Sequence, residues 1–354
     1  MTKHITELNI KTYRGISNLK IKDFGEFNIF VGDNNCGKTS VLEVLKILSQ
    51  PNDIGSIIKV ALNRKNKIKP KDFIDTVLTI FKKEVPNEQD NKNMRDVYTL
   101  EVSCLLKNKW ISLEIFSELS KEFDFSDDNL DFDSLINGTL RVTNDTVKST
   151  NIFTLDSRTR FNVDTTEEFY NCVFMPVNVN LYNSCVTLYP EVIKTEKKDL
   201  FIQVLKIFDK DINDISIIEE MIWIHHKNKE TMPLFSYGSG MQKALLMSIV
   251  LVMAKDGVLL IDEIETALHT LALQEVFSFL IKACKKMNVQ LFSTTHSIEA
   301  LDKLLLTSES YGNLNEIRVI TLKKNEKLNK TTARVLLGYD ALDDRKNYEM
   351  ELRI

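Results

Sequence analysis

Residues 32–39 read Gly-Asp-Asn-Asn-Cys-Gly-Lys-Thr, which has the residue types and spacing of a complete phosphate-binding loop. The two glycines let the backbone curl so that successive amide N–H groups point at phosphate oxygens. Lys38 can reach the β- and γ-phosphates, and the Thr39 hydroxyl can ligate Mg²⁺. The motif predicts an ATP site made of Gly32, Asp33, Asn34, Asn35, Cys36, Gly37, Lys38, Thr39 and Ser40.

Two carboxylates follow a continuous apolar run, Val258–Ile261, that predicts a buried strand. Ligands bind at the carboxyl ends of strands in open α/β sheets. We therefore expect Asp262 to hold Mg²⁺ and Glu263 to polarise the attacking water as a general base. The alternative is an ordinary strand end with two solvated carboxylates, and the phosphate loop upstream favours catalysis.

His296 ends the next apolar run in the same way. A histidine at this position can donate a hydrogen bond to the γ-phosphate and so report its presence. By itself it could equally be a structural cap of the following helix. Together with the two motifs above, it is predicted to be a switch residue. The predicted catalytic residues are thus Glu263, His296 and Lys38.

A third glycine-containing segment, Gly238-Ser239-Gly240-Met241-Gln242-Lys243, opens a predicted helix. Small residues there expose N–H groups and a hydroxyl at a helix N-terminus, which suits an anion. The alternative is that this segment is only the glycine-rich start of a helix and has no catalytic role.

The elements around these motifs predict how they are positioned. Phe27–Val31 is an apolar strand leading into the phosphate loop, and apolar residues at helical spacing follow it. Alternating strands and helices near the end indicate a mostly parallel sheet covered on both faces. The predicted strands and helices are, in order, an edge or half-buried strand at 5–13, a helix over 73–83, a hairpin of 98–106 with 111–115, a strand at 173–177, helices at 200–208, 241–254 and 273–284, a strand at 289–293, and a hairpin of 318–322 with 332–336.

Composition limits the class of protein. The chain has 354 residues, a formal charge of -4 and no apolar run of membrane-spanning length, so nothing global indicates a membrane protein or a nucleic-acid binder. Its five cysteines are scattered and odd in number, which suits free thiols in a reducing compartment. The N-terminus lacks the apolar run of a signal peptide. We expect a soluble cytoplasmic protein.

The four motifs together resemble those of ABC-type ATPases, and most closely the non-transporter ATPases related to RecF, the SMC heads and the OLD (overcoming lysogenization defect) family. The resemblance implies an α/β P-loop NTPase fold: an ABC-type ATPase head with a mixed β N-terminal lobe and a parallel sheet flanked by helices. It implies one domain over 1–354, with a first lobe at 1–50, a variable insertion at 51–170, a lobe carrying the signature, Walker B motif and histidine switch at 171–310, and a C-terminal hairpin and tail at 311–354.

The resemblance also implies site residues and cofactors. Arg14, in the opening Thr-Tyr-Arg-Gly-Ile turn, is similar to an arginine that approaches the nucleotide. Ser239, Gly240 and Gln242 would face the γ-phosphate held by a second subunit, although Met241 replaces the second signature glycine. ATP and Mg²⁺ are the implied cofactors, with Thr39 and Asp262 as metal ligands. No convincing Q-loop glutamine is found, and Asn178 and Asn180 are weak substitutes.

The implied function is an ATP-hydrolysing switch that forms a homodimer, or a higher oligomer of dimers, around two ATP·Mg. Only 58 residues follow His296, too few for the metal-dependent TOPRIM nuclease that many OLD proteins carry. A nuclease-free relative is expected to regulate a separately encoded effector in bacterial anti-phage defence. The alternatives are a DNA-binding ATPase of RecF or SMC type and a nucleotide-gated scaffold with negligible turnover. The basic cluster Arg64, Lys65, Lys67, Lys69 and Lys71 could contact DNA or be a solvated loop.

Overall fold

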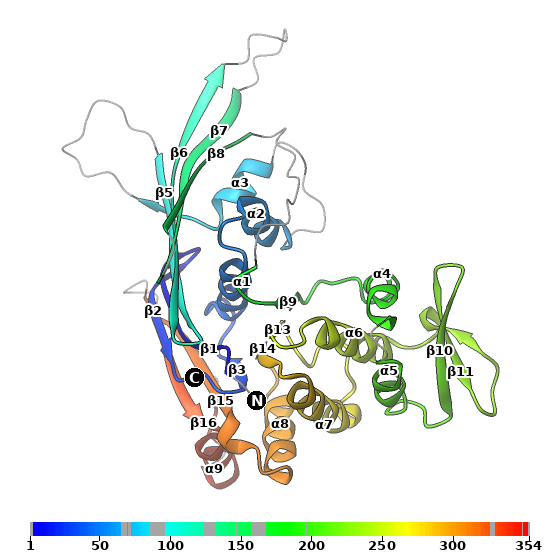
Figure 1. Ribbon diagram of the computed structural model, residues 1–354. Coiled ribbons are helices and arrows are strands. Elements are labelled where there is room, and N and C mark those ends of the chain that lie inside the picture. The colour runs from blue at the N-terminus through cyan, green and yellow to red at the C-terminus, as the bar shows by residue number, and fades with distance from the viewer. Residues whose placement is uncertain are drawn as a thin grey trace.

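The computed structural model describes residues 3–64, 69, 72–84, 96–123, 132–145, 148–156, 168–194, 197–325, 330–348 and 350–352. Their strands form three sheets, and helices pack between and around them (Figure 1).

The sheet that carries the predicted motifs has the strand order β16-β15-β3-β14-β13-β9. All neighbours pair in parallel except β16, which forms an antiparallel hairpin with β15. Strands β3, β13 and β14 are buried at every position, because helices cover both faces. Their carboxyl ends therefore meet at one edge. The strands are β3 (Phe27–Val31), β9 (Cys172–Met175), β13 (Val258–Ile261), β14 (Gln290–Thr294), β15 (Ile317–Asn325) and β16 (Lys330–Leu337).

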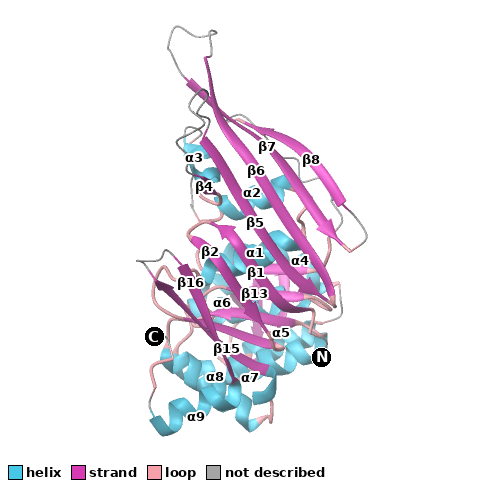
Figure 2. Ribbon diagram, turned by 90° about the vertical axis from the view of Figure 1, so that its left-hand side faces the viewer, coloured by secondary structure: helices cyan, strands magenta, loops and turns pink. Residues whose placement is uncertain are grey.

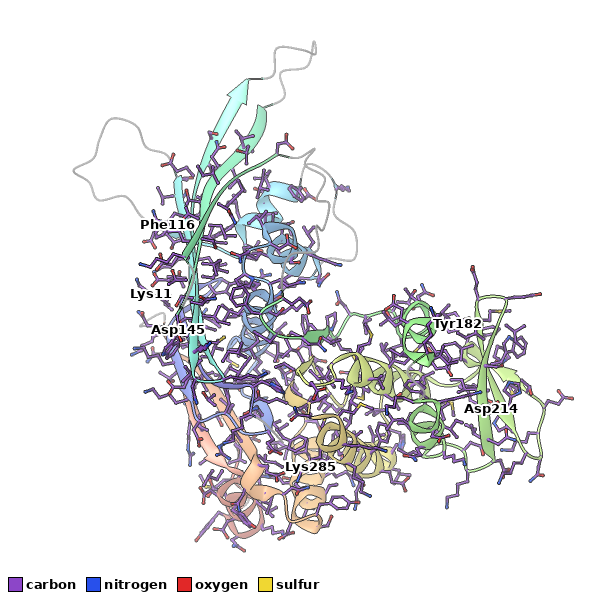
Figure 3. The ribbon with its side chains drawn as sticks, viewed as in Figure 1. Lys11, Phe116, Asp145, Tyr182, Asp214 and Lys285 are labelled. Carbon is purple, nitrogen blue, oxygen red and sulfur yellow. The ribbon has the colours of Figure 1, made fainter. Side chains whose placement is uncertain are left out.

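A second, antiparallel sheet has the order β2-β1-β5-β6-β7-β8, with β4 also paired to β5. Its long strands run side by side in Figure 2. Apolar side chains alternate along β5 and face the core, whereas Lys11 and Phe116 lie on the opposite face (Figure 3). The strands are β1 (Ile5–Tyr13), β2 (Ile16–Lys22), β4 (Lys82–Glu84), β5 (Asp96–Leu106), β6 (Lys109–Phe123), β7 (Phe132–Asn144) and β8 (Lys148–Leu155).

Helix α1 (Lys38–Ser49) packs between these two sheets and is buried along most of its length. Its apolar residues join the inner face of the antiparallel sheet to one face of the parallel sheet in a single core. Helices α2 (Ile54–Leu62) and α3 (Phe73–Leu78) extend this layer (Figure 1). The position of α1 fixes the phosphate loop, which is its N-terminal extension.

A second core covers the other face of the parallel sheet, with α6 at its centre. This helix is buried on nearly all sides, so it cannot shift without disturbing its neighbours. The surrounding elements are α4 (Leu181–Ile193), α5 (Lys198–Leu205), α6 (Ser239–Met253), α7 (Thr270–Met287), α8 (Ile298–Ser310), the 3₁₀ turns Leu234–Ser236 and Leu314–Glu316, α9 (Gly338–Tyr348), and a small sheet of β10 (Ile212–Ile218), β11 (Met221–His226) and β12 (Met232–Pro233).

The predicted elements are found with shifted ends: the strand expected at 173–177 ends at Met175, and the helix expected over 200–208 ends at Leu205. The helix expected over 73–83 ends at Leu78, and Lys82–Glu84 form β4, because these residues pair with β5. Of the two alternatives for 5–13, the half-buried strand is confirmed and the edge strand is not, since β1 pairs with both β2 and β5. The division of the chain at 50, 170 and 310 stays a prediction. Among the described residues, no helix combines the length and apolarity needed to span a membrane.

Candidate nucleotide and magnesium site

The phosphate loop connects β3 to α1, and its two glycines have backbone conformations that other residues rarely adopt. Gly32 has φ 138° and Gly37 has φ 104°. A Cβ atom on Gly32 would lie 2.3 Å from the carbonyl oxygen of Leu322, and one on Gly37 would lie 2.9 Å from Ile16 Cδ1. Both backbone strain and close packing therefore require glycine at these positions.

Lys38 is folded back across the loop. Its ammonium donates hydrogen bonds of 2.8 Å to the carbonyl oxygens of Gly32 and Asp33, and its side chain is only 5% exposed. The cation is thus held at the mouth of the loop, where the predicted triphosphate would bind. Cys36 Sγ lies 3.8 Å from the same nitrogen.

Cys36 itself is 2% exposed, and burial raises the pKa of its thiol. A buried thiol with a raised pKa is a poor nucleophile.

Thr39 and Asp262 meet at the strand edge, as the sequence predicted for a metal site. The Thr39 hydroxyl lies 3.1 and 3.0 Å from the two carboxylate oxygens of Asp262, and Thr294 Oγ1 donates to Oδ1 at 2.7 Å. Burial raises the pKa of Asp262, and the hydrogen bonds from Thr294 and Thr39 oppose this rise. A hydroxyl and a carboxylate in contact supply the hard oxygen donors that Mg²⁺ prefers, so the residues fit this ion.

The structure brings Glu263 and His296 together. His296 Nε2 lies 3.7 Å from Glu263 Oε1, and Thr266 Oγ1 donates to Glu263 Oε2 at 2.9 Å. Glu263 has φ 48°, and its N–H donates to Thr294 Oγ1 at 2.8 Å. Such a conformation is costly for a non-glycine residue and is typical of functional turns. Both side chains are about one-third exposed, so water can reach them.

Glu265 holds the histidine loop in place, which the sequence did not predict. Its Oε1 accepts hydrogen bonds from the backbone N–H groups of His296 at 2.9 Å and Ser297 at 3.2 Å. Ser297 is also the cap of α8. Glu265 therefore links the turn after β13 to the turn after β14, and no local pattern in the sequence indicates this pairing.

A cleft of about 450 Å³ opens over the phosphate loop. It is lined by residues 14–16 and 34–40 together with Arg64, His296, Lys324 and Thr331. No Asp or Glu is among the described residues that line it, so its walls are polar and cationic. This charge suits a polyphosphate.

Arg14 and Arg64 share one buried carboxylate. Arg14 Nε lies 3.0 Å from Glu43 Oε2 and Arg64 Nε lies 2.7 Å from Glu43 Oε1, while Arg64 also donates to Ser40 Oγ. Glu43 is itself buried in α1. Arg14 therefore borders the cleft as expected, but its guanidinium is engaged with the protein, so phosphate contact stays a prediction.

Arg64 was predicted only as one member of a basic cluster that is either a DNA contact or a solvated loop. Arg64 lies in an exposed turn, where it is ion-paired with Glu43 at the wall of the cleft, and the choice between a DNA contact and a solvated loop stays open. Lys65, Lys67 and Lys71 lie outside the described residues.

The signature residues lie elsewhere. Among the described residues that line the cleft there is neither Ser239, Gly240 nor Gln242. Ser239 is exposed at the N-terminus of α6, and Gln242 Nε2 donates to the carbonyl oxygen of Tyr237 at 3.0 Å. Met241, which replaces a signature glycine, is buried in the core around α6. The replacement of the signature glycine by Met241 thus adds an apolar side chain to this core.

The two Q-loop substitutes have other partners. Asn180 accepts a hydrogen bond from the N–H of Asn183 and caps α4, and Asn178 Nδ2 donates to the carbonyl oxygen of Asn63. Neither lines the described part of the cleft.

Comparisons with known proteins find several relatives of the chain. A protein of Helicobacter pylori named ATP/GTP phosphatase is 24% identical over 342 residues, which covers 85% of this chain and 88% of that protein. Two uncharacterized proteins of Methanocaldococcus jannaschii are 41% identical over 75 residues and 26% identical over 204 residues. The chain covers 66% and 55% of their lengths.

Among solved structures, an Smc head bound to the C-terminal winged-helix domain of ScpA matches with a TM-score of 0.53 and 12% identity, covering 96% of this chain and 100% of that one. This likeness shows the fold, and the predicted α/β P-loop fold of an ABC-type ATPase head is confirmed.

The OLD family is not identified specifically. The family described as "AAA domain, putative AbiEii toxin, Type IV TA system" matches residues 27–302, more than half of the chain. With the phosphatase relative, this match supports ATPase activity. The chain therefore belongs to this family of AAA-domain proteins.

Proposed function

We propose that the protein is an ATP-driven switch in which two copies close head-to-head around two ATP·Mg. The observation that carries the proposal is the separation of its motifs. The cleft of one subunit is lined by the phosphate loop and His296, whereas the signature residue Ser239 is exposed outside it. A second copy can supply that residue to the open side of the cleft.

Within one subunit, each residue has a distinct task. Lys38 exchanges its two carbonyl partners for oxygens of the β- and γ-phosphates. Thr39 and Asp262 would hold Mg²⁺, which would neutralise charge on the phosphates. Glu263 accepts a proton from the attacking water, and His296 donates a hydrogen bond to the γ-phosphate.

The signature residues of the partner copy complete the site. The N-terminus of α6 offers backbone N–H groups and the Ser239 hydroxyl to the γ-phosphate held opposite. The γ-phosphate is then a ligand shared by both subunits. Its removal by hydrolysis eliminates these contacts, so the closed dimer loses its differential stabilisation and opens.

For the biological role, we propose a cytoplasmic regulatory ATPase of bacterial anti-phage defence that controls a separately encoded effector such as a nuclease. The toxin–antitoxin description of the matched family supports this role. The second candidate is a DNA-binding ATPase of repair, which the Smc-like fold favours. ATP-dependent binding of duplex DNA would select the second role.

The switch is tested by light scattering after size-exclusion chromatography, with and without ATP·Mg. Glu263→Gln should form a stable dimer only with ATP, because hydrolysis is blocked while binding is kept. Lys38→Ala should stay monomeric in both conditions. An unchanged elution profile of Glu263→Gln on addition of ATP contradicts the proposal, and negligible phosphate release by the wild type would select a nucleotide-gated scaffold.

A further inference from the structure

We propose that the C-terminal hairpin β15–β16 forms a third wall of the nucleotide site in the same subunit, where Lys324 binds phosphate oxygens and Thr331 hydrogen-bonds the nucleoside. The inference rests on nucleotide binding in the cleft but not on dimerisation. Neither residue belongs to the phosphate loop, the Walker B turn or the signature segment.

The topology brings the hairpin to this place. Strand β15 pairs in parallel with β3, so its carboxyl end emerges beside the phosphate loop. Strand β16 returns alongside β2 (Figure 2). A Cβ atom on Gly15, in the turn between β1 and β2, would lie 3.5 Å from the Lys324 ammonium. The ammonium is therefore at the rim formed by this turn and lines the cleft.

The basic side chains Arg14, Arg64 and Lys38, which line the cleft together with Lys324, have partners within the protein. Arg14 and Arg64 are both paired with Glu43, and Lys38 is bound to loop carbonyls. For the Lys324 ammonium, no ion pair or hydrogen bond is found among the residues that the structure describes. An exposed lysine facing a carboxylate-free wall is suited to an anion of the substrate.

Thr331 gives an independent indication of a ligand. Its side chain is 1% exposed, it lines the cleft, and its hydroxyl oxygen has no hydrogen-bond partner among the described residues. A buried hydroxyl without a partner costs free energy. A polar group of a bound nucleoside would satisfy it.

Strands β15 and β16 each contain a neighbouring residue of the same type that can serve as a matched control. Lys323 and Lys324 are adjacent and both exposed, but only Lys324 lines the cleft. Thr332 is exposed next to Thr331. Dissociation constants for ATP·Mg and ADP·Mg are measured by calorimetry on the full chain carrying Ser239→Arg, which blocks the proposed dimer contact.

Lys324→Ala should weaken ATP binding about tenfold, as expected for a lost hydrogen bond to a charged group, while Lys323→Ala stays within twofold. Thr331→Val should weaken the binding of ATP and of ADP to the same extent, whereas Thr331→Ser, which keeps the hydroxyl, should bind both as the parent does. Thr332→Val should leave both dissociation constants unchanged. Equal affinities for Lys324→Ala and its parent, or equal losses for both lysine variants, overturn the role of Lys324. Failure of Thr331→Ser to restore binding overturns that of Thr331. Failure of the dimer proposal leaves these constants unchanged.

Discussion

The ammonium nitrogen of Lys243 lies 3.5 Å from the carbonyl oxygen of Glu263. Lys243 is on α6, one turn after Ser239, and is 2% exposed. It therefore joins the signature helix to the turn that carries the predicted general base. Burial lowers the pKa of Lys243 to about 8, and the negative charges of Glu265, Asp262 and Glu263 oppose this shift.

The first prediction concerns the pH dependence of stability. Because the pKa of Lys243 in the folded protein is below its ordinary value of 10.5, the unfolded chain binds more protons between pH 8 and 10.5. The free energy of unfolding of the wild type should then rise with pH relative to Lys243→Met, by up to about 3 kcal/mol, since one pKa unit is about 1.4 kcal/mol.

Urea unfolding at several pH values, without nucleotide or Mg²⁺, measures this difference. A gap between the two proteins that does not change between pH 7 and 10.5 would show that Lys243 keeps an ordinary pKa.

A second prediction concerns Glu265, whose Oε1 accepts from the N–H groups of His296 and Ser297. Glu265→Ala removes both hydrogen bonds. Because His296 is then no longer held in place, kcat should fall about tenfold, and the free energy of unfolding should fall by about 2 kcal/mol. Glu265→Gln keeps an acceptor oxygen and should lose less of both. Steady-state phosphate release and chemical unfolding check these values, with the exposed Glu299→Ala as control. Full activity of Glu265→Ala would rule out the positioning role.

A third prediction separates stability from function at Asp262. Burial raises its pKa, so at neutral pH the ionised carboxylate destabilises the fold, an effect that disappears when pH falls below the ordinary aspartate range. Asp262→Asn should therefore raise Tm by about 2 °C at pH 7 without ligands, because its amide keeps an acceptor for Thr294. It should also abolish the stabilisation that ATP·Mg gives the wild type.

Thermal melts with ATP, with and without Mg²⁺, check both parts. If Asp262→Asn is stabilised by ATP·Mg as strongly as the wild type, Asp262 is not a metal ligand.

The sequence predicted the parts of the site that depend on a few consecutive residues. The phosphate loop, the Asp262-Glu263 pair and His296 each follow a short apolar strand, and parallel pairing brings their ends to one edge. These predictions needed only local pattern and the rule that ligands lie at strand ends.

Residues whose role depends on distant packing were not predicted. Arg64 reaches the cleft because α2 returns toward α1, and Lys324 because β15 pairs with β3 across the chain. Lys243 follows a glycine-rich helix start and has the residue type of a surface position, yet α6 is buried on nearly all sides. Likewise, Lys82–Glu84 lack apolar alternation and form a strand only because β5 offers a free edge.

The composite site is tested most directly by mixing two inactive proteins. Lys38→Ala removes the phosphate-loop cation and Ser239→Arg obstructs the signature, so each variant alone should hydrolyse ATP slowly. A mixed dimer contains one site with an intact phosphate loop facing an intact signature. Equimolar mixing should restore phosphate release to at least about a tenth of the wild-type rate, and the control variant Ser236→Arg, at an exposed position, should be fully active. A mixture no more active than its separate components would contradict the shared site.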